Sequence, residues 1–123
     1  MVTKNQDILM RCIEELRKID PEMPIQRVST FIYVVLHEGT NIKAISEALN
    51  VDKTTTNRNV RALGKFHRNR SPGHDLIYPK VDPKEPRRYM FKLTAKGKRL
   101  AQLISEIIEG KFTAKTKPKK KRG

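Results

Sequence analysis

Residues 42–63 carry the pattern that most restricts what this chain can fold into. Ile42, Ile45 and Leu49 recur at helical spacing, and Val60 and Leu63 follow in the same way a few residues later. Each segment therefore has one apolar side to bury, and the connection between the segments is short. The pattern predicts two short helices that pack against each other across a tight turn.

The residues of the turn favour the same arrangement. Asn50 follows the first helix, where the backbone commonly turns left-handed, and Asn tolerates that conformation better than any residue except glycine. Val51 is expected to fill the turn, and Asp52 to cap the second helix by accepting hydrogen bonds from its first amides. Ser46 is small enough to allow the two helices to approach closely.

The second helix is expected to present polar side chains on its exposed side. Such side chains can bond to phosphates or to the edges of bases, and they are Lys53, Thr54, Thr55, Asn57, Arg58 and Arg61. This pattern indicates a helix-turn-helix whose second helix reads DNA. An ordinary helical hairpin with a solvated basic face has the same local pattern, so the surrounding sequence has to decide between the two.

The positive charge of the chain is concentrated in one region. The net charge is +14, but residues 1–52 hold 6 Lys and Arg against 8 Asp and Glu. Residues 53–99 hold 14 against 3, and residues 111–123 hold 7 basic and no acidic residues. A basic region that begins at the second helix is typical of nucleic-acid binding. Binding to a membrane surface is the alternative, but no basic amphipathic helix with aromatic anchors accompanies the charge.

Two further helices are predicted before the helix-turn-helix. Residues 3–19 are amphipathic, and Thr3 and Gln6 at their start resemble a capping box. Residues 24–38 are apolar around much of the predicted helix, which ends at Gly39. The second of these helices is therefore expected to be the central buried one.

A hairpin and a last helix are predicted after it. The short strands 76–79 and 88–93 are joined by residues 80–87, a basic loop whose prolines we expect to hold it extended. Two strands of this kind after a reading helix form a wing. An amphipathic helix follows over residues 94–109, with Thr94 as its cap. Residues 111–123 are expected to be disordered because they contain one aromatic and no acidic residue.

Taken in order, these elements and motifs resemble the MarR family of winged helix-turn-helix regulators. The stretches that carry the resemblance are MPIQRVSTFIYVVLHEG, IKAISEALNVDKTTTNRNVRAL, VDPKEPRR and FKLTAKGKRL, which span about residues 20–104. In VDPKEPRR, Asp82 and Arg87 match the first and last positions of the family's wing signature, and Lys84 replaces its middle arginine. The resemblance implies a mainly α-helical winged helix-turn-helix with a small β-hairpin.

The resemblance also implies how such a chain works. It is expected to be a homodimer that binds a pseudo-palindromic site on double-stranded DNA and represses transcription. We expect one domain over residues 1–110, with a reader over 40–93 and helices 3–19 and 94–109 at the dimer interface, and a basic tail over 111–123 that adds non-specific affinity. The wing contacts to the minor groove are expected from Lys84, Arg87 and Arg88.

Other classes of function have little support in the sequence. No glycine-rich phosphate loop, paired-carboxylate motif or activated nucleophile indicates an enzyme, and no cofactor is expected. The scattered His37, His67 and His74 do not form a metal site. We interpret Cys12 as a small apolar residue packed in its helix rather than as a peroxide sensor. No segment is apolar enough to cross a membrane, so a cytoplasmic, nucleoid-associated protein is expected, and nothing indicates a small-molecule effector.

Two alternatives use the same features. An architectural or replication-associated protein would coat or bend DNA with little sequence preference, which the high charge and the tail favour. A winged-helix module that docks on an acidic protein partner would use the same basic region. The ordered set of polar residues on the second helix favours the regulator.

Overall fold

The computed structural model of the 123-residue chain describes residues 4–65 and 72–110. The chain divides into two units. Glu22–Lys98 form one, here called the reader unit, and Met1–Pro21 with Arg99–Gly123 form the other, here called the terminal unit. The predicted capping residue Thr3 and the predicted basic tail lie outside the described residues.

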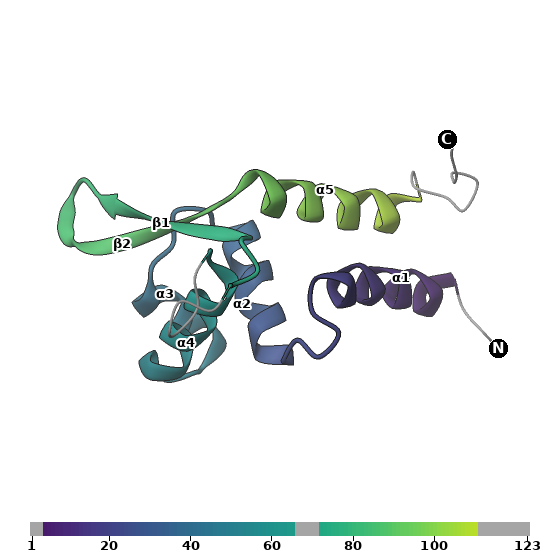
Figure 1. The fold of residues 1–123 in the computed structure, drawn as a ribbon, viewed down its shortest axis with the longest axis horizontal. Coiled ribbons are helices and arrows are strands. Elements are labelled where there is room, and N and C mark those ends of the chain that lie inside the picture. The colour runs from purple at the N-terminus through teal and green to yellow at the C-terminus, as the bar shows by residue number, and fades with distance from the viewer. Residues whose placement is uncertain (1–3, 66–71, 111–123) are drawn as a thin grey trace. The chain divides into compact units, whose positions relative to one another are not determined.

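Three helices form the body of the reader unit, and the hairpin projects beyond them (Figure 1). They are α2 (Ile25–Leu36), α3 (Ile42–Leu49) and α4 (Lys53–Leu63), and each contacts the other two. The bounds of α3 and α4 agree with the sequence prediction. The buried side of α4 includes Val60 and Leu63, as predicted, with exposures of 5% and 0%.

α2 is the central element because it contacts α3, α4 and the second strand of the hairpin. Its inward face carries Phe31 and Val34, both fully buried. Less of the surface of α2 is buried than the sequence predicted, since Ile25 and Leu36 at its two ends are exposed. It also ends earlier than predicted, because the backbone leaves the helix after Leu36 and turns to a positive φ of 97° at Gly39.

The wing is an antiparallel hairpin of β1 (Ile77–Asp82) and β2 (Glu85–Leu93). Both strands extend into residues 80–87, for which the sequence predicted an extended loop. Only Pro83 and Lys84 remain between the strands, so the prediction of a long loop was wrong. A proline whose φ is already fixed suits such a tight turn.

The pairing of the two strands is irregular close to this turn. Val81 lies opposite Tyr89, whereas the next residue, Asp82, lies opposite Glu85, so β2 has surplus residues between these two pairs. Pro86 is one of the surplus residues. Its missing N–H removes no hydrogen bond from the ladder there, which is why a strand accepts proline at a bulge. Pro86 therefore marks a bulge and not a loop.

Backbone bonds connect the wing to the segment between α2 and α3. Gly39 donates its N–H to the carbonyl of Phe91 at 2.8 Å, and Phe91 donates its own N–H to the carbonyl of Thr40, also at 2.8 Å. The carboxylate of Glu38 accepts the N–H of Leu93 at 2.9 Å. This bridge, which no sequence pattern predicted, fixes the base of the wing to the helices.

The last helix, α5 (Ala95–Glu109), begins in the reader unit and continues into the terminal unit. Thr94 caps it, as predicted, by accepting the N–H of Gly97 at 3.0 Å, and it donates its own hydroxyl to the carbonyl of Asp75 at 2.7 Å. A Cβ at Gly97 would overlap the carbonyl oxygen of Leu76. The first turn of α5 therefore packs directly on the chain that enters the hairpin, and only glycine fits there.

The terminal unit contains α1 (Lys4–Ile19) and the larger part of α5. Both helices are amphipathic, as predicted. The apolar side chains buried in this unit are Cys12, Leu16, Leu100 and Ile107. Three other members of the same apolar stripes are exposed, namely Leu9, Ile13 and Ile108. Met10 on α1 is exposed as well. The described unit thus leaves a considerable apolar surface in solvent.

Candidate nucleic-acid interface

The junction between α3 and α4 has the geometry that the sequence predicted. Asn50 is left-handed, with φ 55° and ψ 49°. Asp52 caps α4 by accepting the N–H of Thr55 on Oδ1 at 2.7 Å. Asn41 caps α3 in the same way, accepting the N–H of Ala44 at 2.9 Å. The roles predicted for Asn50 and Asp52 are confirmed, and the Asp52 cap fixes the position at which α4 begins.

The electrostatics of this cap follow from the same bonds. Hydrogen bonds from the backbone and side chain of Thr55, with a smaller contribution from the charge of Arg58, lower the pKa of Asp52 below its ordinary value. A hydrogen bond to the charged form favours that form. Asp52 is therefore a carboxylate at neutral pH, and its charge compensates the positive end of the α4 dipole.

A buried polar contact that the sequence did not reveal joins the two helices. Ser46 on α3 donates its hydroxyl to the hydroxyl of Thr56 on α4 at 2.8 Å. The two residues are 7% and 1% exposed. The bond gives the Ser46 donor an acceptor, which is necessary because a buried polar group without a partner lowers stability. The expectation that a small Ser46 allows close approach agrees with this contact, but its chemical role was missed.

The exposed side of α4 carries the side chains predicted to contact DNA. Thr55 is the exception, because it is half-buried and not exposed. Its N–H is bonded to the Asp52 cap. Asn59 is buried and belongs to the interior. No acidic residue lies within α4, so its solvent side is neutral or positive. The exposed residues are Lys53, Thr54, Asn57, Arg58 and Arg61.

The predicted wing residues do not behave alike. Asp82 fixes the turn by accepting the N–H of Lys84 on Oδ1 at 2.9 Å, and its Oδ2 lies 3.7 Å from Nε of Arg88. Arg88 therefore has an acidic partner inside the wing, although a partly exposed pair of this kind contributes only about 0–1 kcal/mol. Arg87 and Lys84 are exposed near the turn.

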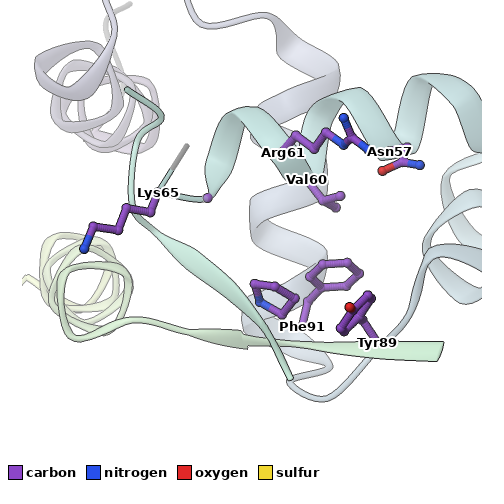
Figure 2. A pocket seen from close by; sticks show the side chains of 8 residues that line it. Asn57, Val60, Arg61, Lys65, Tyr89 and Phe91 are labelled. Carbon is purple, nitrogen blue, oxygen red and sulfur yellow. The ribbon is translucent and has the colours of Figure 1, made fainter. Parts of the chain in front are cut away.

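A groove of about 410 Å³ lies between α4 and the hairpin, here called the helix–wing groove (Figure 2). Its lining residues are Asn57, Val60, Arg61, Gly64, Lys65, Pro79, Tyr89 and Phe91. Asn57 and Arg61 extend from α4, and Tyr89 and Phe91 extend from the hairpin toward them (Figure 2). Neither the groove nor its aromatic side was predicted, because the hairpin residues follow α4 only after a loop whose path cannot be read from the sequence.

The remaining candidate groups have local roles. Cys12 is buried, and burial, with a smaller effect of the nearby Glu15 charge, raises the pKa of its thiol. This agrees with its interpretation as a packed apolar residue. The rings of Tyr33 and His37 lie 4.4 Å apart, and His67 lies outside the described residues.

Neither a metal-binding cluster nor a membrane-spanning helix occurs among the described residues. Residues 4–65 and 72–110 contain no group of three or more His, Cys, Asp and Glu side chains placed to hold a metal ion. Among the same residues, no helix combines the length and the apolar character that crossing a bilayer requires.

Comparison with known proteins identifies the fold. No protein-family profile and no curated protein sequence matches the chain. Among solved structures, the MepR–DNA complex of Staphylococcus aureus superposes with a TM-score of 0.68 at 22% identity, covering 86% of this chain and 79% of that one. A MarR transcriptional regulator from Methanosarcina mazei Go1 gives 0.60 at 23% identity, covering 85% and 71%. Rv1404 from Mycobacterium tuberculosis gives 0.68 at 18% identity, covering 88% and 68%. The chain has the MarR-type winged-helix fold, as the sequence resemblance implied.

Proposed function

We propose that this protein is a sequence-specific, non-enzymatic regulator of transcription that binds double-stranded DNA as a homodimer and represses. The observation that carries the proposal is the exposed side of α4. A helix capped at its start by Asp52 presents five exposed polar or basic side chains and no acidic one, beside a hairpin with exposed Arg87. The major groove, about 12 Å wide, admits such a helix.

The residue types suit the two grooves of DNA differently. An amide such as that of Asn57 can bond to adenine with two hydrogen bonds, and a guanidinium such as that of Arg58 can do the same with guanine. Lys53 and Thr54, at the start of α4, are placed to approach phosphates. In the wing, Arg87 is the candidate for the minor groove, which is narrow and strongly negative where A·T pairs follow one another.

Arg88 remains a proposed wing contact. Its guanidinium also lies 3.7 Å from the carboxylate of Asp82, so it pairs within the wing as well. Lys84 keeps its predicted role as a wing contact, because its backbone fixes the turn while its side chain is exposed. The basic tail, outside the described residues, would add affinity for any sequence.

Known proteins of this fold support the proposal. One of the similar structures is a complex with DNA, and another is a transcriptional regulator. The exposed apolar side chains of the terminal unit support the homodimer, since Leu9, Met10 and Ile108 are 61%, 56% and 58% exposed in the single chain. A two-fold dimer would bury them and would place two α4 helices on a site of matching symmetry. A cytoplasmic, nucleoid-associated location follows from this function.

Selection from a random-sequence duplex library tests the proposal. The expected result is enrichment of a two-fold motif by the wild-type protein. A variant with both Asn57→Ala and Arg58→Ala is the matched control, because both side chains are exposed and the variant should fold normally, bind duplexes and enrich no motif. Binding of the wild type without any enriched motif would favour the architectural alternative, and failure to bind duplex DNA would favour the protein-docking alternative.

A further inference from the structure

The two walls of the helix–wing groove differ in chemistry. The α4 wall presents the amide of Asn57 and the guanidinium of Arg61, both on exposed residues. The hairpin wall presents the rings of Tyr89 and Phe91 (Figure 2). Val60, which is 5% exposed, lies between the walls (Figure 2). A ligand that fills this groove needs an anionic or polar side and an apolar side next to each other.

The apolar wall continues the protein core into solvent. Side chains alternate along a strand, so residues in directly opposite pairs separated by two positions share one face of the hairpin. The innermost pair is buried, at 1% for Ile77 and 8% for Leu93, whereas the outermost is half exposed, at 52% for Val81 and 55% for Tyr89. The three pairs on this face are Ile77 with Leu93, Pro79 with Phe91, and Val81 with Tyr89. The outer part of this ladder is apolar surface that no described residue covers fully.

We propose that the helix–wing groove holds the sugar-phosphate backbone of one DNA strand, with Arg61 bonding a phosphate and Tyr89 packing on a deoxyribose. This inference rests on the proposed function and deepens it. If α4 lies in the major groove and the hairpin in the adjacent minor groove, the strand that separates the two grooves must pass between α4 and the hairpin. A phosphate matches the polar wall, and the carbon face of a deoxyribose matches the apolar wall.

This assignment gives the two arginines of α4 different contacts. Asn57 and Arg61 are four residues apart, lie on the same side of the helix and line the groove. Arg58 does not line it. Arg61 is thereby assigned to the backbone, and Arg58 is left to face the bases. Lys65 lies at the end of the groove with its side chain directed away from the aromatic rings (Figure 2), so no phosphate contact is assigned to it.

The test measures affinity for two duplexes of equal length, one with the selected motif and one of random sequence, over a range of salt concentrations. Arg61→Gln should lower affinity for both duplexes by the same factor, about tenfold for the loss of one charged hydrogen bond. It should also reduce the slope of log affinity against log salt by about 0.9. Arg17→Gln is the matched control, because this exposed arginine of α1 pairs with Glu14, and it should change neither quantity.

Variants of Tyr89 test the apolar wall separately. Tyr89→Ala should lower affinity for both duplexes without changing the salt slope, since no charge is removed. Tyr89→Phe should bind like the wild type, because the ring that packs on the sugar remains. Arg61 and Tyr89 are both exposed, so thermal unfolding of the variants should match that of the wild type.

Several results would overturn the inference and leave the proposed function standing. One is a change of preference at a single base pair in Arg61→Gln with unchanged binding to random duplex, which would make Arg61 a base reader. Another is wild-type affinity in both Arg61→Gln and Tyr89→Ala, which would mean that the groove is empty in the complex. A loss in Tyr89→Phe as large as in Tyr89→Ala would remove the sugar contact. If the wild type binds no duplex DNA, the proposed function itself has failed.

Discussion

The hydroxyl of Ser46 donates a 2.8 Å hydrogen bond to the hydroxyl of Thr56, and this buried pair joins the two helices of the helix-turn-helix. Asn50 sets the direction of the chain between the helices, and Asp52 sets where α4 begins. The hydroxyl pair adds a constraint across the interface itself. The exposed side of α4 therefore has a defined orientation before it meets any partner.

Removing one member of the pair should destabilise the fold more than removing both. Thr56→Val keeps the shape of the side chain but leaves the buried Ser46 hydroxyl without this partner, which should cost about 1–3 kcal/mol in the free energy of unfolding. The double variant, Ser46→Ala with Thr56→Val, should recover part of that loss. Urea denaturation of the two single variants and the double variant measures the coupling. Strictly additive effects would show that the hydrogen bond contributes nothing.

The Asp52 cap should make stability depend on acid pH. Because the hydrogen bonds from Thr55 lower the pKa of Asp52 in the folded state, the unfolded chain binds the proton more readily. The stabilisation is present in full above the unfolded-state pKa of about 3.9 and is lost as the pH falls through the folded-state value. Asp52 is exposed, so solvent screening keeps the effect small.

Asp52→Asn is the matched comparison for this effect, because an Asn side chain can still cap the helix but does not titrate in this range. Denaturation curves of both proteins between about pH 5 and 2 should converge at the acid end, since the wild-type carboxylate is then protonated. A constant difference across that range would contradict the role assigned to the charge.

The parts of the fold that the sequence predicted are those fixed by neighbouring residues. The bounds of α3 and α4, the left-handed Asn50 and the caps at Asp52 and Thr94 all depend on residues within one turn of helix. The bridge from Gly39 to Phe91 depends on two segments far apart in sequence, so no local pattern reveals it. The long wing loop was predicted wrongly because proline is read as a loop signal, whereas a bulge accepts it as well.

In the candidate site, too, only the features that depend on neighbouring residues were predicted. Helical periodicity was sufficient to place Asn57, Arg58 and Arg61 on the exposed side of α4. It did not show that Tyr89 lies across a groove from two of them, because this depends on how the hairpin packs on α4. The alternation of apolar residues in β2 is a usable signal, because residues two positions apart on a strand share one face. The partner of Arg88 was likewise missed, since it requires the strand register.

A charge at the predicted dimer interface should dissociate the dimer. Leu103 is half-buried on the apolar side of α5, so Leu103→Glu should place a carboxylate in the interface and shift the protein to monomer. Ser105→Glu, at an exposed position of the same helix, is the control and should leave the oligomeric state unchanged. Sedimentation velocity measures both variants. A wild-type protein that stays monomeric at high micromolar concentration would remove the dimer from the proposal.

The Cys12 thiol should be unreactive in the folded protein. Burial and the charge of Glu15 raise its pKa, so little thiolate is present at neutral pH. Its rate of reaction with a disulfide reagent at pH 7 should be well below that of the urea-unfolded chain. Cys12→Ala should retain DNA binding in the presence of peroxide and in its absence. Loss of wild-type binding on peroxide treatment, with no such loss in Cys12→Ala, would establish the sensor that we do not expect.

Arg87 in the wing should read DNA shape and not an individual base. Arg87 is exposed near the turn, whereas its neighbour Arg88 faces Asp82 at 3.7 Å. A guanidinium held at a narrow minor groove gains from its strong negative potential, so Arg87→Ala should weaken binding most where the motif is flanked by A·T pairs.

Two matched variants separate shape reading from charge. Arg87→Lys keeps the charge but loses the planar and weakly hydrated guanidinium, so it should retain affinity for G·C-flanked sites and lose part of the A·T preference. Lys80→Ala removes a charge elsewhere on the hairpin and should lower affinity for both kinds of site equally. The measurement is the ratio of affinities for motif duplexes that differ only in their flanks. If Arg87→Ala leaves that ratio at the wild-type value, the wing contributes only charge, and sequence preference must come from α4 alone.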